Sequence, residues 1–345
     1  MRHVAALALP IFIAACSDAT ASPSEDAGST GDAASTVDAG ALDGNATNDA
    51  PIDAPRTACQ GARDASTIAP VLFYNLKSAP FPGTAHPDVA VHIPVGFDGT
   101  RRPGLIVFFN GFDNCVANVM GSVDTPCTPG GAARDALHLV DQIDLAHVNA
   151  ILVAVEIDFD QATGNPGQLT TPGNFHALLH ELFTEHVNAV IGCALDVGDL
   201  DRVVVSSHSG GYQAAAATIA HGQVPQLREI DLLDSLYGEI PTFDGWVQNN
   251  VKRFDPMRAD ALRWVDVYTS TGGTDASSRT MSTSASMWLS GVGLSASYFD
   301  DDTTATLAPA DYAHAVIFKH SALPHGDVPK YYVQQLAQAS GFAPL

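Results

Sequence analysis

Residues 202–220 are RVVVSSHSGGYQAAAATIA, and this stretch decides the fold. The valines at 203–205 predict a buried strand, because short runs of β-branched residues suit a pleated sheet. The alanine-rich residues 212–220 predict a helix, since alanine has the highest helix propensity. Between them, residues 207–211 follow the pattern small-x-Ser-x-small, so we expect a sharp turn from strand to helix.

Ser209 stands at the centre of this turn. Such a turn leaves its serine exposed at the carboxyl edge of a sheet, and backbone strain holds it there. Small residues are needed two positions before and after the serine, because backbones crowd at the turn. Ser207 and Gly211 meet this need, although Ser207 departs from the more usual glycine. We therefore predict that Ser209 is a nucleophile. The same pattern at 293–297 has no valine strand before it.

The chain begins with a short basic segment followed by an apolar run, 4–15, too short to span a bilayer. Residues 13–16, IAAC, resemble a bacterial lipobox, in which cleavage precedes a cysteine that is then lipidated. The resemblance implies a signal peptide over 1–15 and a lipid on Cys16; the alternative is an ordinary cleaved signal. By analogy with enterobacterial lipoproteins, Ser17 favours the cell envelope, at the outer membrane of a Gram-negative bacterium.

Residues 16–57 are predicted to be a lipidated, disordered linker that tethers the rest of the chain to the membrane. They contain no aromatic residue and eight acidic residues against one arginine, so they cannot bury enough apolar surface to fold.

From 58 to 345 the composition is that of one globular domain. The formal net charge of −22 argues against a nucleic-acid partner. We expect a monomer.

Four cysteines remain after Cys16, and an even number in an exported protein favours disulfides. Cys115 and Cys127 would close a short loop, worth about 3 kcal/mol. Cys59 and Cys193 would then pair by exclusion, although four cysteines allow three connectivities. No cysteine or histidine spacing suggests a metal site, and we expect no cofactor.

Apolar, β-rich runs alternate with helical patterns along the domain, which predicts a mostly parallel sheet covered on both faces. The clearest helix covers 172–191, with Thr171 as its cap and Pro172 in its first turn. The predicted strands are a leading antiparallel pair, 71–76 and 89–94, and then 105–109, 150–155, 203–206, 230–233, 264–268 and 315–318.

A serine turn after the fifth of eight strands resembles the α/β-hydrolase fold, and the resemblance covers residues 65–340. It implies a mostly parallel eight-stranded sheet with helices on both faces. The connections leave no room for a large cap, but 112–135 and 157–172 are long enough for a small lid.

The resemblance also implies a general base on the loop after the last strand. His325 lies there, just before a helix predicted to begin near Pro329, and His320 at the strand's end is the alternative. For the acid, Asp234 follows the sixth strand and is favoured, because a strand end holds a carboxylate rigidly. Asp275, after the seventh strand, is the alternative acid.

An oxyanion hole is expected where the strand 105–109 enters Asn110-Gly111-Phe112. The turn would aim the backbone N–H of Phe112 inward, and Gly210 would supply the second donor. Where the family often has histidine, this chain has Asn110, so an amide must shape the turn.

These residues predict a serine hydrolase of the esterase and lipase type that forms an acyl-enzyme on Ser209. The substrate would be a small-molecule or polymer ester, since four apolar and aromatic residues are expected near the mouth of the site: Phe112, Tyr212, Tyr237 and Trp246. Two alternatives stay open. One is a serine peptidase or amidase of the same fold, and the other is a non-catalytic binding lipoprotein.

Overall fold

The computed structural model describes residues 68–345, apart from 85, 159–160, 162–163 and 304–305. All of these residues belong to one compact unit, Pro55–Leu345. The predicted signal peptide and linker, with Cys16 and Cys59, lie outside the described residues. No helix in the described part of the chain is long and apolar enough to cross a membrane.

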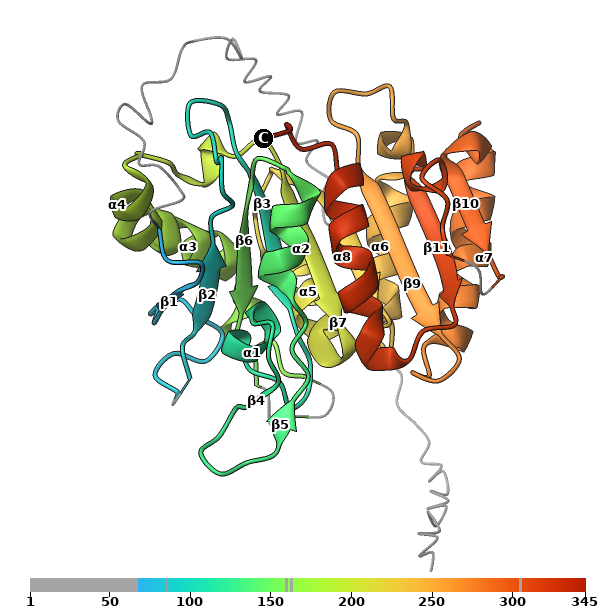
Figure 1. The fold of residues 1–345 in the computed structure, drawn as a ribbon. Coiled ribbons are helices and arrows are strands. Elements are labelled where there is room, and N and C mark those ends of the chain that lie inside the picture. Colours follow the sequence, from blue (N-terminus) through green and yellow to red (C-terminus); the bar gives the residue numbers. More distant parts are fainter. Residues whose placement is uncertain (1–67, 85, 159–160, 162–163, 304–305) are drawn as a thin grey trace, which may run out of the picture. The chain divides into compact units, whose positions relative to one another are not determined.

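A nine-stranded sheet forms the centre of this unit (Figure 1). Strand β2 is antiparallel to both of its neighbours, and all other pairs are parallel. Across the sheet the strands are β1 (Leu72–Tyr74), β2 (Val89–His92), β6 (Ala150–Val155), β3 (Gly104–Phe109), β7 (Val203–His208), β8 (Leu227–Leu233), β9 (Arg263–Thr269), β11 (Val316–Ser321) and β10 (Tyr298–Asp301).

All eight predicted strands are present, but the sheet has nine. The additional strand is β10, which pairs in parallel with β11 at the edge of the sheet. Its sequence, YFDD, has no apolar run and stays partly exposed. An edge strand of this kind is held by its neighbour's backbone, so its own composition carries little strand signal.

Helices cover both faces of the sheet, as predicted (Figure 1). One face packs against α1 (Val116–Met120), α2 (Leu139–Ala146) and α8 (Val328–Ala339). The opposite face packs against α3 (Asn174–Glu181), the π-helical turn Leu182–Val187, α4 (Asn188–Ile191), α5 (Tyr212–His221), α6 (Ile240–Asn249) and α7 (Asp275–Gly291). The parallel strands are therefore buried on both sides, which explains their continuous apolar sequences.

The helix expected over 172–191 begins later than its sequence suggested. Helical geometry starts at Asn174, after Gly173, whose φ of +79° lies in the left-handed region. Thr171 makes no side-chain capping bond and ends a preceding 3₁₀ turn, so the predicted cap was wrong. The glycine breaks the helical path, because it adopts this conformation at little cost.

Candidate active site

Ser209 occupies the turn between β7 and α5, where a strand becomes a helix within three residues. Its φ is +54°, in the left-handed region that residues other than glycine rarely enter. Such a conformation costs on the order of 1–3 kcal/mol and persists only when the surrounding structure enforces it. The predicted strained turn is therefore present at Ser209.

Close backbone approach explains the small residues around the turn. A Cβ atom on Gly211 would lie 2.3 Å from the carbonyl oxygen of Phe109, so glycine is required there. Ser207 is buried, and its hydroxyl donates to the Ser235 hydroxyl at 3.0 Å. The Ser235 hydroxyl donates in turn to the carbonyl of Ser209 at 2.8 Å. The hydroxyl of Ser207 therefore has a polar partner in the interior, which explains how serine is tolerated at the position where glycine is more usual.

His325 lies in the turn between β11 and α8, half-buried, with its ring directed at Asp234. Its Nδ1 is 2.7 Å from Oδ2 of Asp234. Asp234 follows β8 and is fully buried. The same carboxylate accepts hydrogen bonds from the hydroxyls of Thr269 and Thr274 and from the backbone N–H of Thr269. This geometry is that of an imidazole oriented by a fixed carboxylate.

Burial alone would raise the pKa of the Asp234 carboxyl. The hydrogen bonds from His325, Thr274 and Thr269 outweigh burial and hold that pKa below its usual value. Asp234 is therefore a stable anion next to the imidazole.

The two alternatives for base and acid make other contacts. Asp275 begins α7 and accepts a hydrogen bond from Arg279 at 2.9 Å. His320 stacks on Tyr268, and its Nε2 lies 2.8 Å from the Ser270 hydroxyl. The structure therefore brings Asp234, and not Asp275, to His325.

Ser209 and His325 line one cavity of about 540 Å³. Its remaining walls come from the turn after β3 and from the segment that carries β4 (Thr125–Pro126) and β5 (Ala133–Arg134). The nucleophile and base candidates thus share a space large enough for a small substrate.

The turn after β3 lies against the serine turn. A Cβ atom on Gly111 would be 2.2 Å from the backbone nitrogen of Gly210, so only glycine fits. The amide of Asn110 donates to the carbonyl of Gly111 at 3.2 Å, and Phe112 lines the cavity. An amide therefore contacts this turn, as expected for Asn110. The roles of Phe112 and Gly210 as oxyanion donors stay a prediction.

His208 is a site residue that the sequence analysis missed. It is buried directly before Ser209, with its Nδ1 3.0 Å from Oδ1 of Asn110 and its Nε2 3.1 Å from the carbonyl of His325. Burial, together with the nearby His325, lowers the pKa of His208 to about 3. A neutral His208 ring thus links the turn after β3 to the loop of His325. Its position next to the nucleophile, at the end of a central strand, was the available signal.

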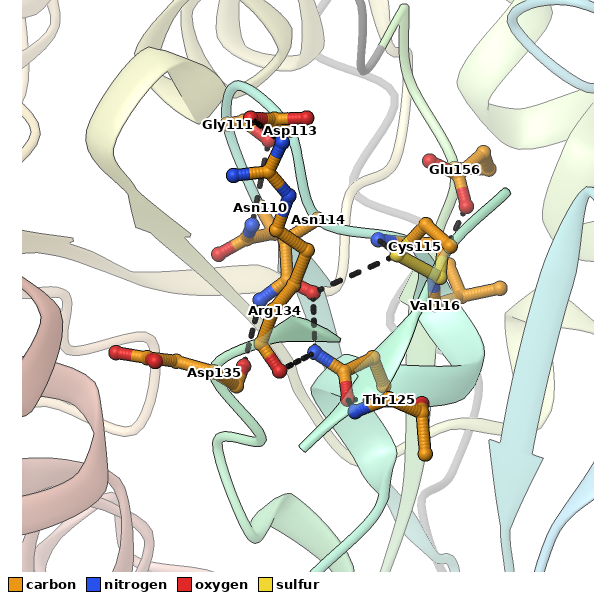
Figure 2. The surroundings of a disulfide bond; sticks show 12 residues. Asn110, Gly111, Asp113, Asn114, Cys115, Val116, Thr125, Arg134, Asp135 and Glu156 are labelled. Carbon is orange, nitrogen blue, oxygen red and sulfur yellow. Dashed lines mark hydrogen bonds and ion pairs between the residues drawn. A yellow bond between two sulfur atoms is a disulfide. The ribbon is translucent and has the colours of Figure 1, made fainter. Parts of the chain in front are cut away.

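The mouth of the cavity is only partly the apolar one expected. Of the four residues predicted there, Phe112 lines the cavity, the Tyr237 hydroxyl lies 3.5 Å from Nδ1 of His325, and the Tyr212 ring lies beside that of Tyr237. Trp246 packs instead against Trp264 and Phe254. The cavity wall also carries charged residues, Asp113, Arg134 and Asp135. They flank a disulfide, Cys115–Cys127, with a Cα–Cα distance of 5.6 Å (Figure 2). That predicted disulfide is confirmed, while the pairing of Cys59 with Cys193 stays a prediction.

No protein-family model and no curated protein sequence matches the chain. Solved structures do resemble it. A feruloyl esterase module from Clostridium thermocellum, complexed with sinapinate, has 8% identity and a TM-score of 0.50, covering 82% of this chain and 94% of that one. Ferric enterobactin esterase from Salmonella typhimurium has 15% identity and a TM-score of 0.43, covering 79% and 58%. An esterase from Thermogutta terrifontis has 12% identity and a TM-score of 0.36, covering 73% and 86%. With the strand order and the serine turn, the likeness to the feruloyl esterase module shows that residues 68–345 have the α/β-hydrolase fold.

Proposed function

We propose that this protein is a serine hydrolase that cleaves carboxylic esters through an acyl-enzyme on Ser209. The observation that carries the proposal is the 2.7 Å contact between His325 and buried Asp234, with His325 and Ser209 lining the same cavity. A strained serine, an imidazole and an oriented carboxylate from three strand ends form the set that acyl transfer requires.

In the first half-reaction, Nε2 of His325 accepts the proton of Ser209 as the serine oxygen bonds to the ester carbon. Asp234 keeps the proton of His325 on Nδ1 and stabilises the imidazolium that forms. The N–H groups of Phe112 and Gly210 would hold the negative oxygen of the tetrahedral intermediate. The intermediate expels the alcohol, which takes the proton from His325 and leaves an acyl group on Ser209.

In the second half-reaction, water gives a proton to His325 and attacks the acyl-enzyme. The new tetrahedral intermediate expels the oxygen of Ser209, which recovers its proton from His325, and the acid leaves. An ester is favoured over an amide because its leaving group is a better one. The feruloyl esterase module that shares this fold is, by its name, an esterase, which supports the same choice.

A fluorophosphonate probe tests the nucleophile. The wild-type protein should be labelled and Ser209→Ala should not, while Ser295→Ala, in the second sequence match at 293–297, should be labelled like the wild type. Equal labelling of wild type and Ser209→Ala would show that Ser209 is not the nucleophile.

The kind of bond that the enzyme cleaves is tested by comparing the rates of hydrolysis of p-nitrophenyl esters and aminoacyl p-nitroanilides. Faster turnover of the esters is expected. Faster turnover of the anilides would indicate a peptidase. If neither substrate is hydrolysed and the probe does not label the protein, the protein is a binding protein.

We also propose that Cys16 carries a lipid that anchors the protein in the cell envelope. The support is the apolar run that ends in IAAC and the acidic linker after it. The acidic linker would then connect the domain to its lipid anchor.

A further inference from the structure

Residues 113–135, which we name the strap, line the cavity with their two ends, Asp113 and Asn114 at one and Ala133, Arg134 and Asp135 at the other. The disulfide Cys115–Cys127 closes the base of the strap (Figure 2). Inside it, fully buried Asn118 donates to Asn114 and to the backbone carbonyl of Arg134, each at 2.7 Å, and accepts from the N–H of Thr125 at 3.0 Å. One covalent bond and one satisfied amide therefore fix the backbone of Arg134.

One ion pair forms between the two ends of the strap, and a second contact joins the strap to α8. On the side of the predicted oxyanion turn, Arg134 forms an ion pair with Asp113, the residue after Phe112 (Figure 2). On the side of the base, the Asp135 carboxylate lies 3.5 Å from Lys330 of α8. A Cβ atom on Gly326, next to His325, would be only 3.3 Å from that carboxylate.

These charges make the wall polar, with the carboxylates of Asp113 and Asp135 and the guanidinium of Arg134 on the cavity lining. The side chains of Asp113 and Arg134 keep 28% and 39% of their surface exposed, so water reaches the hydrogen-bonding positions that the ion pair leaves open. An alkyl chain laid on this wall would remove that water and return no hydrogen bond, which is unfavourable for charged groups. Hydroxyl groups would replace the water as both donors and acceptors.

Resting on the proposed ester hydrolysis, we propose that the strap selects esters that carry hydroxyl groups, and disfavours plain alkyl esters. Asp113 and Arg134 are the specificity-determining residues of this proposal.

Two acetates with the same carbon skeleton test the proposal in the wild-type protein. Glycerol 1-acetate and n-propyl acetate would form the same acetyl-enzyme and differ only in two hydroxyl groups. We expect kcat/KM to favour the glycerol ester by about tenfold, the equivalent of one hydrogen bond. Equal values for the two esters would overturn the proposal.

The double variant Asp113→Asn/Arg134→Met removes the ion pair without leaving either charge unpaired. Asparagine tolerates the φ of +70° at residue 113. The tenfold ratio should fall to about one. Since both acetates share one acyl group and one oxyanion, any disturbance of the oxyanion turn affects both rates alike and cancels in the ratio. If the variant melts like the wild type and its ratio of kcat/KM for the two acetates is unchanged, Asp113 and Arg134 do not determine the selectivity and the proposal is wrong.

The matched control is Lys77→Met/Glu185→Gln, which removes an exposed ion pair of 3.8 Å on β1's side of the sheet. It should leave both kcat/KM values unchanged. Fluorophosphonate labelling separates the two proposals. A labelled protein with a ratio of one contradicts the selectivity alone, whereas a protein that is neither labelled nor active on acetates contradicts ester hydrolysis itself.

Discussion

Replacement of Asp234 by asparagine tests the catalytic assignment most directly, because the structure defines the fate of each hydrogen bond. Oδ1 of Asp234 accepts from the N–H of Thr269 and the hydroxyl of Thr274, and an asparagine oxygen can keep both bonds. Oδ2 accepts from the Thr269 hydroxyl and from Nδ1 of His325, each at 2.7 Å. An NH₂ group would take the place of Oδ2.

The Thr269 hydroxyl can adapt to this change, because it can accept from the NH₂ group and donate to Thr271, which lies 3.2 Å away. The imidazole cannot adapt without loss. Facing a donor, Nδ1 of His325 must become an acceptor, so its proton moves to Nε2, the atom that should receive the proton of Ser209. We expect kcat to fall by about 10⁴-fold, or about 5 kcal/mol, with only a small change in melting temperature.

The assay is steady-state hydrolysis of p-nitrophenyl acetate, with thermal melting as a check on folding. Asp275→Asn is the matched control, since Asp275 pairs with Arg279 on the exposed surface of α7, and its kcat should change less than twofold. Retention of more than a tenth of the activity by Asp234→Asn would refute the reasoning. So would a large loss in Asp275→Asn.

Three further predictions concern stability and location. Cys115→Ser/Cys127→Ser opens a loop of sequence separation 12 and should lower the free energy of unfolding by about 3 kcal/mol in urea titrations; a loss below about 1 kcal/mol would mean that other contacts hold the loop. Burial raises the pKa of Asp266 to about 8, so its protonated form stabilises the fold at low pH, and this contribution is lost as the pH rises from about 4 toward 8. The melting temperature of Asp266→Asn relative to wild type should therefore increase over this range, and parallel curves would contradict the assignment. Cys16→Ser should abolish incorporation of radiolabelled palmitate and move the protein from the membrane fraction to the soluble fraction, and unchanged fractionation would indicate another anchor.

The parts of the fold that could be predicted are those whose sequence and environment agree locally. The valines of β7 are buried on both faces of the sheet and are followed by a glycine turn and an alanine helix, so pattern and packing point the same way. Asp234 followed from the same logic, since it stands directly after a predicted strand. His325 lies further along, in the loop between β11 and α8, and was predicted from the place of the base in the α/β-hydrolase family.

The charged wall and the contacts of His208 could not be predicted, because they join segments that are distant in the sequence. Residues 121–135 have neither helical nor strand periodicity, and the two-residue strands β4 and β5 form where the disulfide closes the loop. Gly272 is a similar case. A Cβ atom there would lie 1.9 Å from Oδ2 of Asp234, so this glycine makes room for the acid, but nothing in its own neighbourhood reveals that.

The contacts that build the site also determine when during folding it can form. Asp234 and His325 are 91 residues apart, Asn110 and His208 are 98 apart, and His208 and the carbonyl of His325 are 117 apart. Each contact closes a long loop, and such contacts form slowly because chain entropy is lost before they can stabilise anything. Strand β11 and the His325 turn follow β7 and β8 in the chain, so the site cannot form until residue 325 has been synthesised. Recovery of activity on refolding should therefore lag behind the recovery of helical circular dichroism.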